Sequence, residues 1–280
     1  MNFSKLHGAG NDFLLFDGRG GVTAEALAPL VPALCHRRLG LGADGVLVLL
    51  PTGERRARVV YWNSDGSPAA FCGNGTRCAA RFAAERWGWR EMVLETGFAA
   101  VPAVVEGASV TLQLPAPAEV REERTFVVHG STIPARYLML GVPHLVLRVA
   151  WPDFWEHPLD PLAPLLRRHA QLPDGGANVN FAKAMADGTL AARFYERGVE
   201  GETLASGSGV VAVALVAAAE GWASPPVRVL TASGRELVVE FDGVPPAAPT
   251  RLTGPAEWVA DGVIAADLLN GCGPGSGTRG

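Results

Sequence analysis

An internal repeat is the feature that most constrains how this 280-residue chain can fold. Five short matches occur in the same order at a nearly constant offset, for example 206 − 72 = 134 residues. They relate Leu6-His7-Gly8 to Leu140-Gly141, Leu27-Ala28-Pro29-Leu30 to Leu162-Ala163-Pro164-Leu165, Gly42-Ala43-Asp44 to Gly176-Ala177-Asn178, Tyr61 to Tyr195, and Cys72-Gly73-Asn74-Gly75 to Ser206-Gly207-Ser208-Gly209. Self-similarity at a fixed spacing indicates repeated structural units, so we predict two homologous lobes.

The repeat also sets the expected lobe boundaries. The N-terminal lobe should span residues 1–117 and the C-terminal lobe residues 118–256, with Pro115-Ala116-Pro117-Ala118 as the linker. We expect a last strand over 257–269 that returns to the first lobe. The glycine-rich end, residues 270–280, is expected to be a flexible tail.

Each lobe reads as short strands and a central helix. Segments such as 45–50 and 227–231 are rich in β-branched residues and are bounded by turn-forming residues. A helix is predicted after each glycine-rich turn, over 75–87 and 209–221, and the second is almost wholly apolar and therefore buried. The predicted fold class is α/β (α+β): two pseudo-twofold-related lobes, each of mixed or antiparallel β-structure wrapped around a central helix.

Composition excludes several partners. The net charge is −4, so no basic surplus exists to bind a nucleic-acid backbone. The longest apolar run, 210–219, is too short to span a membrane, and the N-terminus does not resemble a signal peptide, so we expect a cytoplasmic protein. The four cysteines have no C-x-x-C spacing and the histidines are isolated, so we expect no metal site.

The two glycine-rich turns indicate the chemistry. Cys72 precedes a helix start, where unpaired backbone N–H groups and the helix dipole attract anions and favour a thiolate. The second copy carries Ser206 at the equivalent position. If both helix starts face one cleft, they could hold one carboxylate and place a proton carrier on each face of an α-carbon. An amino-acid racemase requires this arrangement, because one group removes the α-proton and another returns a proton on the opposite face.

Several motifs together resemble the diaminopimelate epimerase family. They are MNFSKLHGAGNDF, NSDGSPAAFCGNGTRCAARF, GVPHLVL, GANVNF and YERGVEGETLASGSG, which extend from Asn2 to about Ile264 in the family's order. The resemblance implies a homodimeric, PLP-independent isomerase without cofactors. Its substrate would be a small-molecule amino acid, L,L- or meso-diaminopimelate, used for lysine and cell-wall synthesis.

The resemblance also assigns roles to individual residues. Cys72 and Ser206 stand at the two catalytic positions, and His144 and Glu196 match residues that tune the catalytic thiols. Glu196 would also hold the substrate ammonium and Arg197 the distal carboxylate. The remaining substrate-binding candidates are Asn11, Asn63 and Asn178 through their side chains and Gly73, Asn74, Gly207 and Ser208 through their backbone N–H groups.

The chain departs from the family pattern at three positions. Ser206 replaces the second cysteine, and a hydroxyl is far less acidic than a thiol. Val142 replaces the asparagine of the G-N-P-H turn, and Gly45 replaces a glutamine after the G-x-D pattern. These changes leave open a racemase or epimerase for another amino acid. They also leave open a one-base dehydratase that uses Cys72 alone, or a degenerate relative that only binds an amino acid.

Overall fold

The computed structural model describes residues 1–116, 119–242 and 249–270. The chain forms two compact units, which are treated separately below. Unit 1 comprises Met1–Val110 with Ala256–Gly280, and unit 2 comprises Thr111–Pro255. Two residues of the expected linker, 117–118, and nearly all of the expected tail, 271–280, lie outside the described residues.

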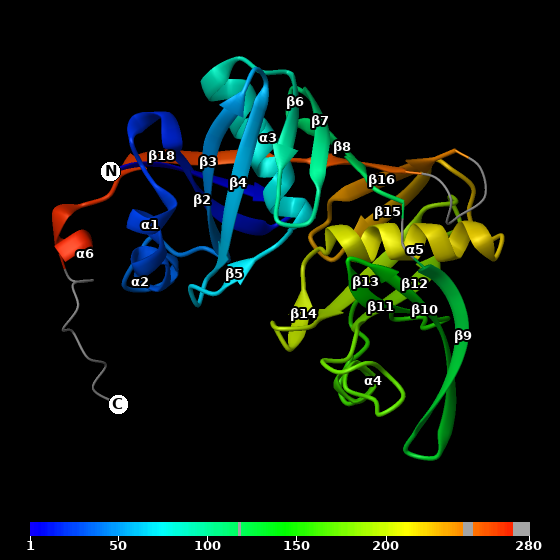
Figure 1. Cartoon of the computed structure of the whole chain (residues 1–280). Helices are drawn as coiled ribbons and strands as arrows, with labels where there is room; N and C mark the ends of the chain where they lie inside the picture. Colours follow the sequence, from blue (N-terminus) through cyan, green and yellow to red (C-terminus); the bar gives the residue numbers. More distant parts are fainter. Residues whose placement is uncertain (117–118, 243–248, 271–280) are drawn as a thin grey trace, which may run out of the picture. The chain divides into compact units, whose positions relative to one another are not determined.

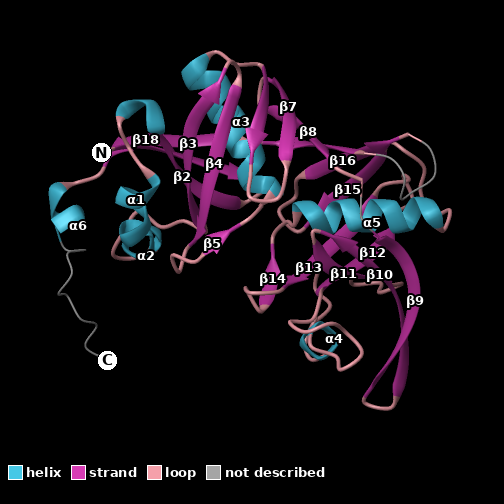
Figure 2. Cartoon of the chain, viewed as in Figure 1, coloured by secondary structure: helices cyan, strands magenta, loops and turns pink. Residues whose placement is uncertain are grey.

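Unit 1 is a sheet-rich body around one long helix (Figures 1 and 2). Its strands are β1 (Asn2–Gly8), β2 (Asn11–Asp17), β3 (Gly45–Gly53), β4 (Arg56–Asn63), β5 (Pro68–Ala69), β6 (Glu91–Glu95), β7 (Ala100–Glu106), the start of β8 (Ser109–Leu114) and β18 (Glu257–Val263). Its helices are η1 (Gly18–Gly20), α1 (Ala24–Leu27), η2 (Ala28–Leu30), α2 (Val31–Cys35), α3 (Gly73–Trp87) and α6 (Ala266–Asn270).

Unit 2 is also built from strands around one long helix. Its strands are the rest of β8, β9 (Glu119–Val128), β10 (Ser131–Leu140), β11 (Val142–Arg148), β12 (Asn178–Ala184), β13 (Leu190–Glu196), β14 (Gly201–Thr203), β15 (Val227–Thr231), β16 (Glu236–Phe241) and β17 (Thr250–Pro255). Its helices are α4 (Leu162–Arg167) and α5 (Gly207–Ala219). Within the described ranges, no helix combines the length and the apolar character needed to cross a membrane.

Strand pairing follows the same sequence in both units. In unit 1, β2 pairs parallel with β3, β3 antiparallel with β4, β4 antiparallel with β5 and parallel with β6, and β6 antiparallel with β7. In unit 2, β11, β12, β13, β14, β15 and β16 pair in the same order and with the same directions. The mixed strand pairing confirms the predicted fold class. Because the strand order is the same in both units, the repeat in the sequence is also a repeat in the structure.

The long helices form the centre of each unit. Residues 210–217 of α5 are all buried, because this segment contains only small and aliphatic side chains. The buried part of α3 includes polar residues, among them Asn74, Thr76 and Arg77. Gly88 ends α3 in the left-handed conformation, with φ of 74°.

The structure corrects the bounds of three predicted elements, the two long helices and the last strand. Both long helices begin two residues earlier than expected, because Cys72 and Ser206 are themselves the N-cap residues and the glycines that follow are the first helical residues. The expected strand over 257–269 ends at Val263, where it has run antiparallel to β1, and α6 follows it. Leu6-His7-Gly8, the first segment of the repeat, is the end of β1, and the chain reverses at Ala9–Gly10.

Candidate active site

In unit 1, Cys72 caps the start of α3. Its Sγ accepts a hydrogen bond from the Gly75 backbone N–H at 3.4 Å and donates to Asn11 Oδ1 at 3.6 Å. The side chain is neither fully buried nor fully exposed. The thiol therefore lies at the positive end of a helix dipole, beside a neutral amide oxygen. We refer to this arrangement as the thiol half-site.

The Asn11 side chain is held on three sides. Its Oδ1 accepts from Asn74 Nδ2 at 3.3 Å as well as from Cys72, and its Nδ2 donates to Asp44 Oδ2 at 2.7 Å. Asp44 is anchored in turn by Arg37 at 2.6 Å. The carboxylate can only accept, so it fixes the amide with its oxygen toward the thiol. Sequence reasoning missed Asp44, which the repeat match at Gly42–Asp44 contains without indicating a role.

A buried cation lies in the first turns of α3. Arg77 is fully buried, and its guanidinium donates to Asn74 Oδ1 at 2.8 Å and to the Gly73 carbonyl at 3.4 Å. Burial lowers the pKa of Arg77 from its usual value. Its positive charge adds to the helix dipole on the side of Cys72. Sequence analysis did not single out this residue, although an arginine two residues after the second glycine of the helix start was a visible signal.

Cys72 differs from Cys35 and Cys78, two other cysteines of unit 1, because their side chains are buried and its own is partly exposed. Burial raises the pKa of Cys35 to about 12 and raises that of Cys78 still further. Both side chains are buried and behave as small apolar groups. Cys272 lies outside the described residues.

Asn63 stands apart from this cluster. Its Nδ2 donates to Ser67 Oγ at 3.0 Å in a turn that the Asp65 carboxylate also stabilises.

Gly45 pairs with Asn63 across the β3–β4 ladder. A Cβ at Gly45 would come within 2.6 Å of both the Trp62 carbonyl oxygen and the Tyr61 ring. Packing therefore requires glycine here, which accounts for the missing glutamine.

In unit 2, Ser206 caps the start of α5 in the same way. Its Oγ accepts from the Gly209 backbone N–H at 3.3 Å and donates to Glu196 Oε2 at 2.8 Å. Thr203 Oγ1 donates to the other carboxylate oxygen, Glu196 Oε1, at 2.5 Å. Ser206 is only 3% exposed. We refer to this arrangement as the hydroxyl half-site. Here the capping side chain donates to a carboxylate, whereas in the thiol half-site it donates to an amide oxygen.

Backbone donors accompany both capping residues. Gly73 and Asn74 open α3, and Gly207 and Ser208 open α5. The first N–H groups of a helix have no acceptor within the helix, so these positions suit an anion. The substrate-binding role predicted for these four residues stays a prediction.

Asn178 and Arg197 form a second pair in unit 2. Asn178 is 6% exposed, and its Oδ1 accepts from the Arg197 backbone N–H at 2.8 Å. This bond positions the residue that follows Glu196 at the end of β13. In the described part of unit 2 the Arg197 guanidinium takes part in no ion pair, so its fork can receive a carboxylate.

His144 lies inside unit 2 and is fully buried. Its Nδ1 faces Asn180 Nδ2 at 3.2 Å, and Asn180 Nδ2 also donates to the Leu145 carbonyl at 2.7 Å. Burial, aided by the positive charge of Arg197, lowers the pKa of His144 to about 4. The ring is therefore neutral near pH 7. Asn180 belongs to the GANVNF motif, but the motif alone assigns it no role.

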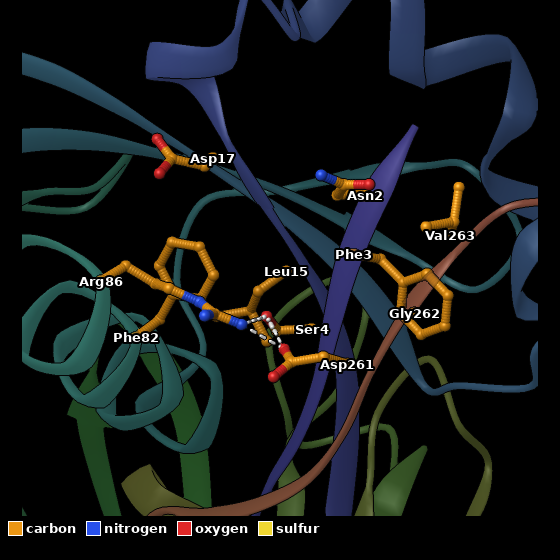
Figure 3. A pocket seen from close by; sticks show the side chains of 10 residues that line it. All are labelled: Asn2, Phe3, Ser4, Leu15, Asp17, Phe82, Arg86, Asp261, Gly262 and Val263. Atoms are coloured by element: carbon orange, nitrogen blue, oxygen red, sulfur yellow. Dashed lines mark hydrogen bonds and ion pairs between the residues drawn. The ribbon is translucent and has the colours of Figure 1, made fainter.

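A separate depression lies on unit 1, away from the predicted residues (Figure 3). It has a volume of about 460 Å³ and contains a bridge in which Arg86 donates to both Asp261 and Ser4. None of the residues predicted for the site lines it. Across the described ranges, no cluster of three or more histidine, cysteine, aspartate or glutamate side chains could hold a metal ion.

Comparison with solved structures identifies the fold. A Bacillus anthracis phenazine biosynthesis protein of the PhzF family superposes with a TM-score of 0.73 at 14% identity, covering 95% of this chain and 99% of that one. A hydroxyproline epimerase from Agrobacterium vitis gives 0.67 at 19% identity, covering 95% and 93%. The chain thus has the two-unit fold shared by PhzF-type proteins and this epimerase.

Sequence comparison is more specific. The family described as diaminopimelate epimerase matches residues 3–97 and 136–259. The diaminopimelate epimerase of Aquifex aeolicus is 38% identical, covering 86% of this chain and 90% of that protein. The one from Archaeoglobus fulgidus is 37% identical, covering 94% and 95%. The chain belongs to the diaminopimelate epimerase family, as the sequence motifs indicated.

Proposed function

We propose that this protein interconverts L,L- and meso-diaminopimelate by proton transfer at the α-carbon, without PLP, for lysine and peptidoglycan precursor synthesis. Family membership over most of the chain supports the isomerase reaction. The observation that carries the mechanism is the duplicated helix start, with Cys72 as the N-cap of α3 and Ser206 as the N-cap of α5. We propose that both half-sites act on one substrate molecule, one on each face of its α-carbon.

On one face Cys72 is the proton carrier. The helix start and the buried Arg77 both favour the anionic form of a nearby thiol. The thiolate removes the α-proton, and the thiol returns a proton in the reverse direction. Backbone N–H groups at Gly73, Asn74, Gly207 and Ser208 would hold the α-carboxylate and stabilise the charge that develops as the proton leaves.

On the other face Ser206 works together with Glu196. A serine hydroxyl alone is a poor base, but its proton already lies on a hydrogen bond to the Glu196 carboxylate. As Ser206 Oγ takes the α-proton, its own proton passes to Glu196 Oε2. The reverse transfer delivers a proton to the carbanion and returns Glu196 to its anionic form. Glu196, which the resemblance also gives to the substrate ammonium, already accepts from two hydroxyl groups.

The remaining predicted residues would bind the distal end of the substrate. Arg197, with its backbone fixed by Asn178, would bind the distal carboxylate. Asn11 and Asn63 would supply further polar contacts. His144 is proposed to act on the charged groups of the site through Nε2, for which the described residues offer no hydrogen-bond partner.

Chiral chromatography of L,L-diaminopimelate incubated with the enzyme tests this function. We expect meso-diaminopimelate to form until the two isomers reach equilibrium, and a Cys72→Ala variant to form none. Inversion of a different amino acid with no conversion of L,L-diaminopimelate would overturn the substrate assignment. Formation of a keto acid from a hydroxylated amino acid would instead support the one-base dehydratase.

We also propose a cytoplasmic homodimer. Strand β18 of unit 1 exposes Val259 and Val263 to 53% and 71%, and such apolar side chains on one strand suit contact with a second copy. Light scattering should give twice the mass of the chain, and a Val259→Asp, Val263→Asp variant should give the monomer. A wild-type protein that is monomeric at micromolar concentration would contradict this proposal.

A further inference from the structure

A buried polar pair beneath the start of α5 carries an inference about tautomer selection. His144 belongs to β11 and Asn180 to the neighbouring parallel strand β12, and both side chains are completely buried. Asn180 faces the same side of the sheet as His144, because it is paired in the ladder with Val146, two residues beyond the histidine. The two side chains therefore meet under α5, within one unit.

The orientation of the Asn180 amide is fixed by its surroundings. Its Nδ2 lies 2.7 Å from the Leu145 carbonyl oxygen, which can only accept a hydrogen bond. Its Oδ1 faces the first turn of α5, since a Cβ on Gly209 would lie 2.6 Å from it. The opposite orientation would set two acceptors against each other at Leu145 and turn the amide donors toward the positive end of the helix.

This orientation decides which nitrogen of His144 carries the proton. Asn180 Nδ2 is a donor, so His144 Nδ1, 3.2 Å away, must be the acceptor. A neutral imidazole with an unprotonated Nδ1 has its proton on Nε2. That Nε2 is buried, and the described residues offer it no hydrogen-bond partner.

We propose that Asn180 is a positioning residue that holds His144 as the neutral Nε2–H tautomer, so that His144 serves the site as a hydrogen-bond donor to an anion and not as a proton acceptor. A buried donor without an acceptor is destabilising, and the cost is recovered when an anion arrives. Two anions of the proposed reaction have this chemistry, a substrate carboxylate and the catalytic thiolate. The role in the reaction rests on the proposed function, whereas the tautomer does not.

Nitrogen-15 NMR of the histidine ring in the intact protein tests the tautomer directly, because protonated and unprotonated ring nitrogens differ strongly in chemical shift. His144 is assigned by the signal that a His144→Gln variant lacks. We expect a protonated Nε2 and an unprotonated Nδ1 at pH 7. A protonated Nδ1 would overturn the proposal, whatever the activity of the enzyme.

Two variants separate positioning from simple packing. In Asn180→Asp the near-isosteric side chain can only accept, so we expect the proton of His144 to move to Nδ1 and kcat to fall about 10- to 100-fold, as for other residues that orient a functional histidine. Asn180→Leu fills similar space without selecting a tautomer, so both ring forms should be populated and kcat should lie between the two. An Asn180→Asp protein with the Nε2–H signal and unchanged kcat would contradict the proposal.

The anion is identified by where the Nε2–H proton signal moves. A shift between the wild type and a Cys72→Ala variant, both without substrate, would assign the thiolate as the acceptor. A shift only when L,L-diaminopimelate is added to the inactive Cys72→Ala variant would assign a substrate carboxylate. If the signal shifts in neither comparison, the proposed donor role of His144 is wrong. That result would not contradict the proposed epimerase reaction, which chiral chromatography tests separately.

Discussion

The thiol and hydroxyl half-sites place different atoms at the same structural position, and each has the partner that its chemistry requires. Cys72 faces the amide oxygen of Asn11, with the buried Arg77 one turn further along the helix. Ser206 faces the carboxylate of Glu196, and the position of Arg77 is taken by Val211 (211 − 77 = 134). A thiol needs a positive field to become a thiolate, whereas a hydroxyl needs an acceptor for its own proton.

The two units differ in a second buried feature. Asn180 in unit 2 corresponds to Val46 in unit 1 at the offset of 134 (180 − 46). Asn180 pairs with Val146 and Val46 pairs with Leu14, so Asp12 in unit 1 takes the ladder position of His144. The repeated strand order is kept, while the polar groups below each helix have diverged. The comparison indicates that the backbone repeat supplies position and that the non-repeated side chains supply the acid–base properties.

The largest effect is expected from Cys72→Ala. It removes the proton carrier of the thiol half-site, and general acid–base groups contribute up to about 10⁴-fold, so we expect a loss of kcat of this size. Circular dichroism and the unfolding midpoint should be near wild type, because Cys72 is only partly buried and lies at the end of a helix. Retention of more than a tenth of the activity would show that sulfur is not needed on this face.

The hydroxyl half-site should fail as a unit. Glu196→Gln and Ser206→Ala are each expected to lower kcat about 10²- to 10³-fold, because either change breaks the path from Ser206 Oγ to the carboxylate. The double variant should be no slower than the worse single variant, since the two residues perform one step. Multiplicative losses measured in steady-state kinetics would mean that serine and glutamate act separately. Ser206→Cys is the matched gain-of-function control and should raise kcat.

Glycines at the same position of the two helices should respond differently to alanine. A Cβ at Gly209 would lie 2.6 Å from both Asn180 Oδ1 and the Phe194 ring, whereas a Cβ at Gly75 has its nearest neighbours at 3.4 Å. We expect Gly209→Ala to lower the free energy of unfolding by about 3 kcal/mol, the upper end for overpacked cores. Gly75→Ala should change it by less than about 1 kcal/mol. Urea unfolding of both variants checks this, and equal losses would contradict the packing.

Acid should destabilise unit 2 through His144. Its pKa is about 4 in the folded chain and near 6.5 when unfolded, so between these values only the unfolded state binds the proton. This contribution to stability is fully present above pH 6.5 and is lost as the pH falls toward 4. Between pH 7 and pH 5 the loss is about 2 kcal/mol at most. Chemical unfolding of the wild type and His144→Leu at both pH values isolates this term, and identical pH slopes would contradict it.

Much of the fold followed from the sequence because the side-chain pattern within each strand and helix is local and periodic. Strands such as Val227–Thr231 and the apolar helix α5 have side chains whose spacing alone indicates their burial. The capping pair Cys72 and Ser206 was predictable for the same reason, since each precedes small helix-starting residues. The start of each helix was placed two residues late because the glycines at 73 and 207 were interpreted as part of a turn.

Contacts between distant segments could not be predicted in the same way. Asp44 orients Asn11 across 33 positions, and Asn180 meets His144 across 36. No periodicity encodes such pairs, because the sheet register brings them together. Gly45 illustrates the reverse case: it seemed to be only a lost glutamine until the Tyr61 ring was found to occupy the space above it.

Deuterium labelling during conversion in D₂O tests the central claim, that two different proton carriers serve opposite faces of one α-carbon. Early in the reaction from L,L-diaminopimelate, we predict by NMR and mass spectrometry that the meso product carries one solvent deuterium at the inverted centre. The unconverted substrate should still carry hydrogen there. Deuterium appearing equally in the remaining substrate and the product, or in neither, would contradict the account.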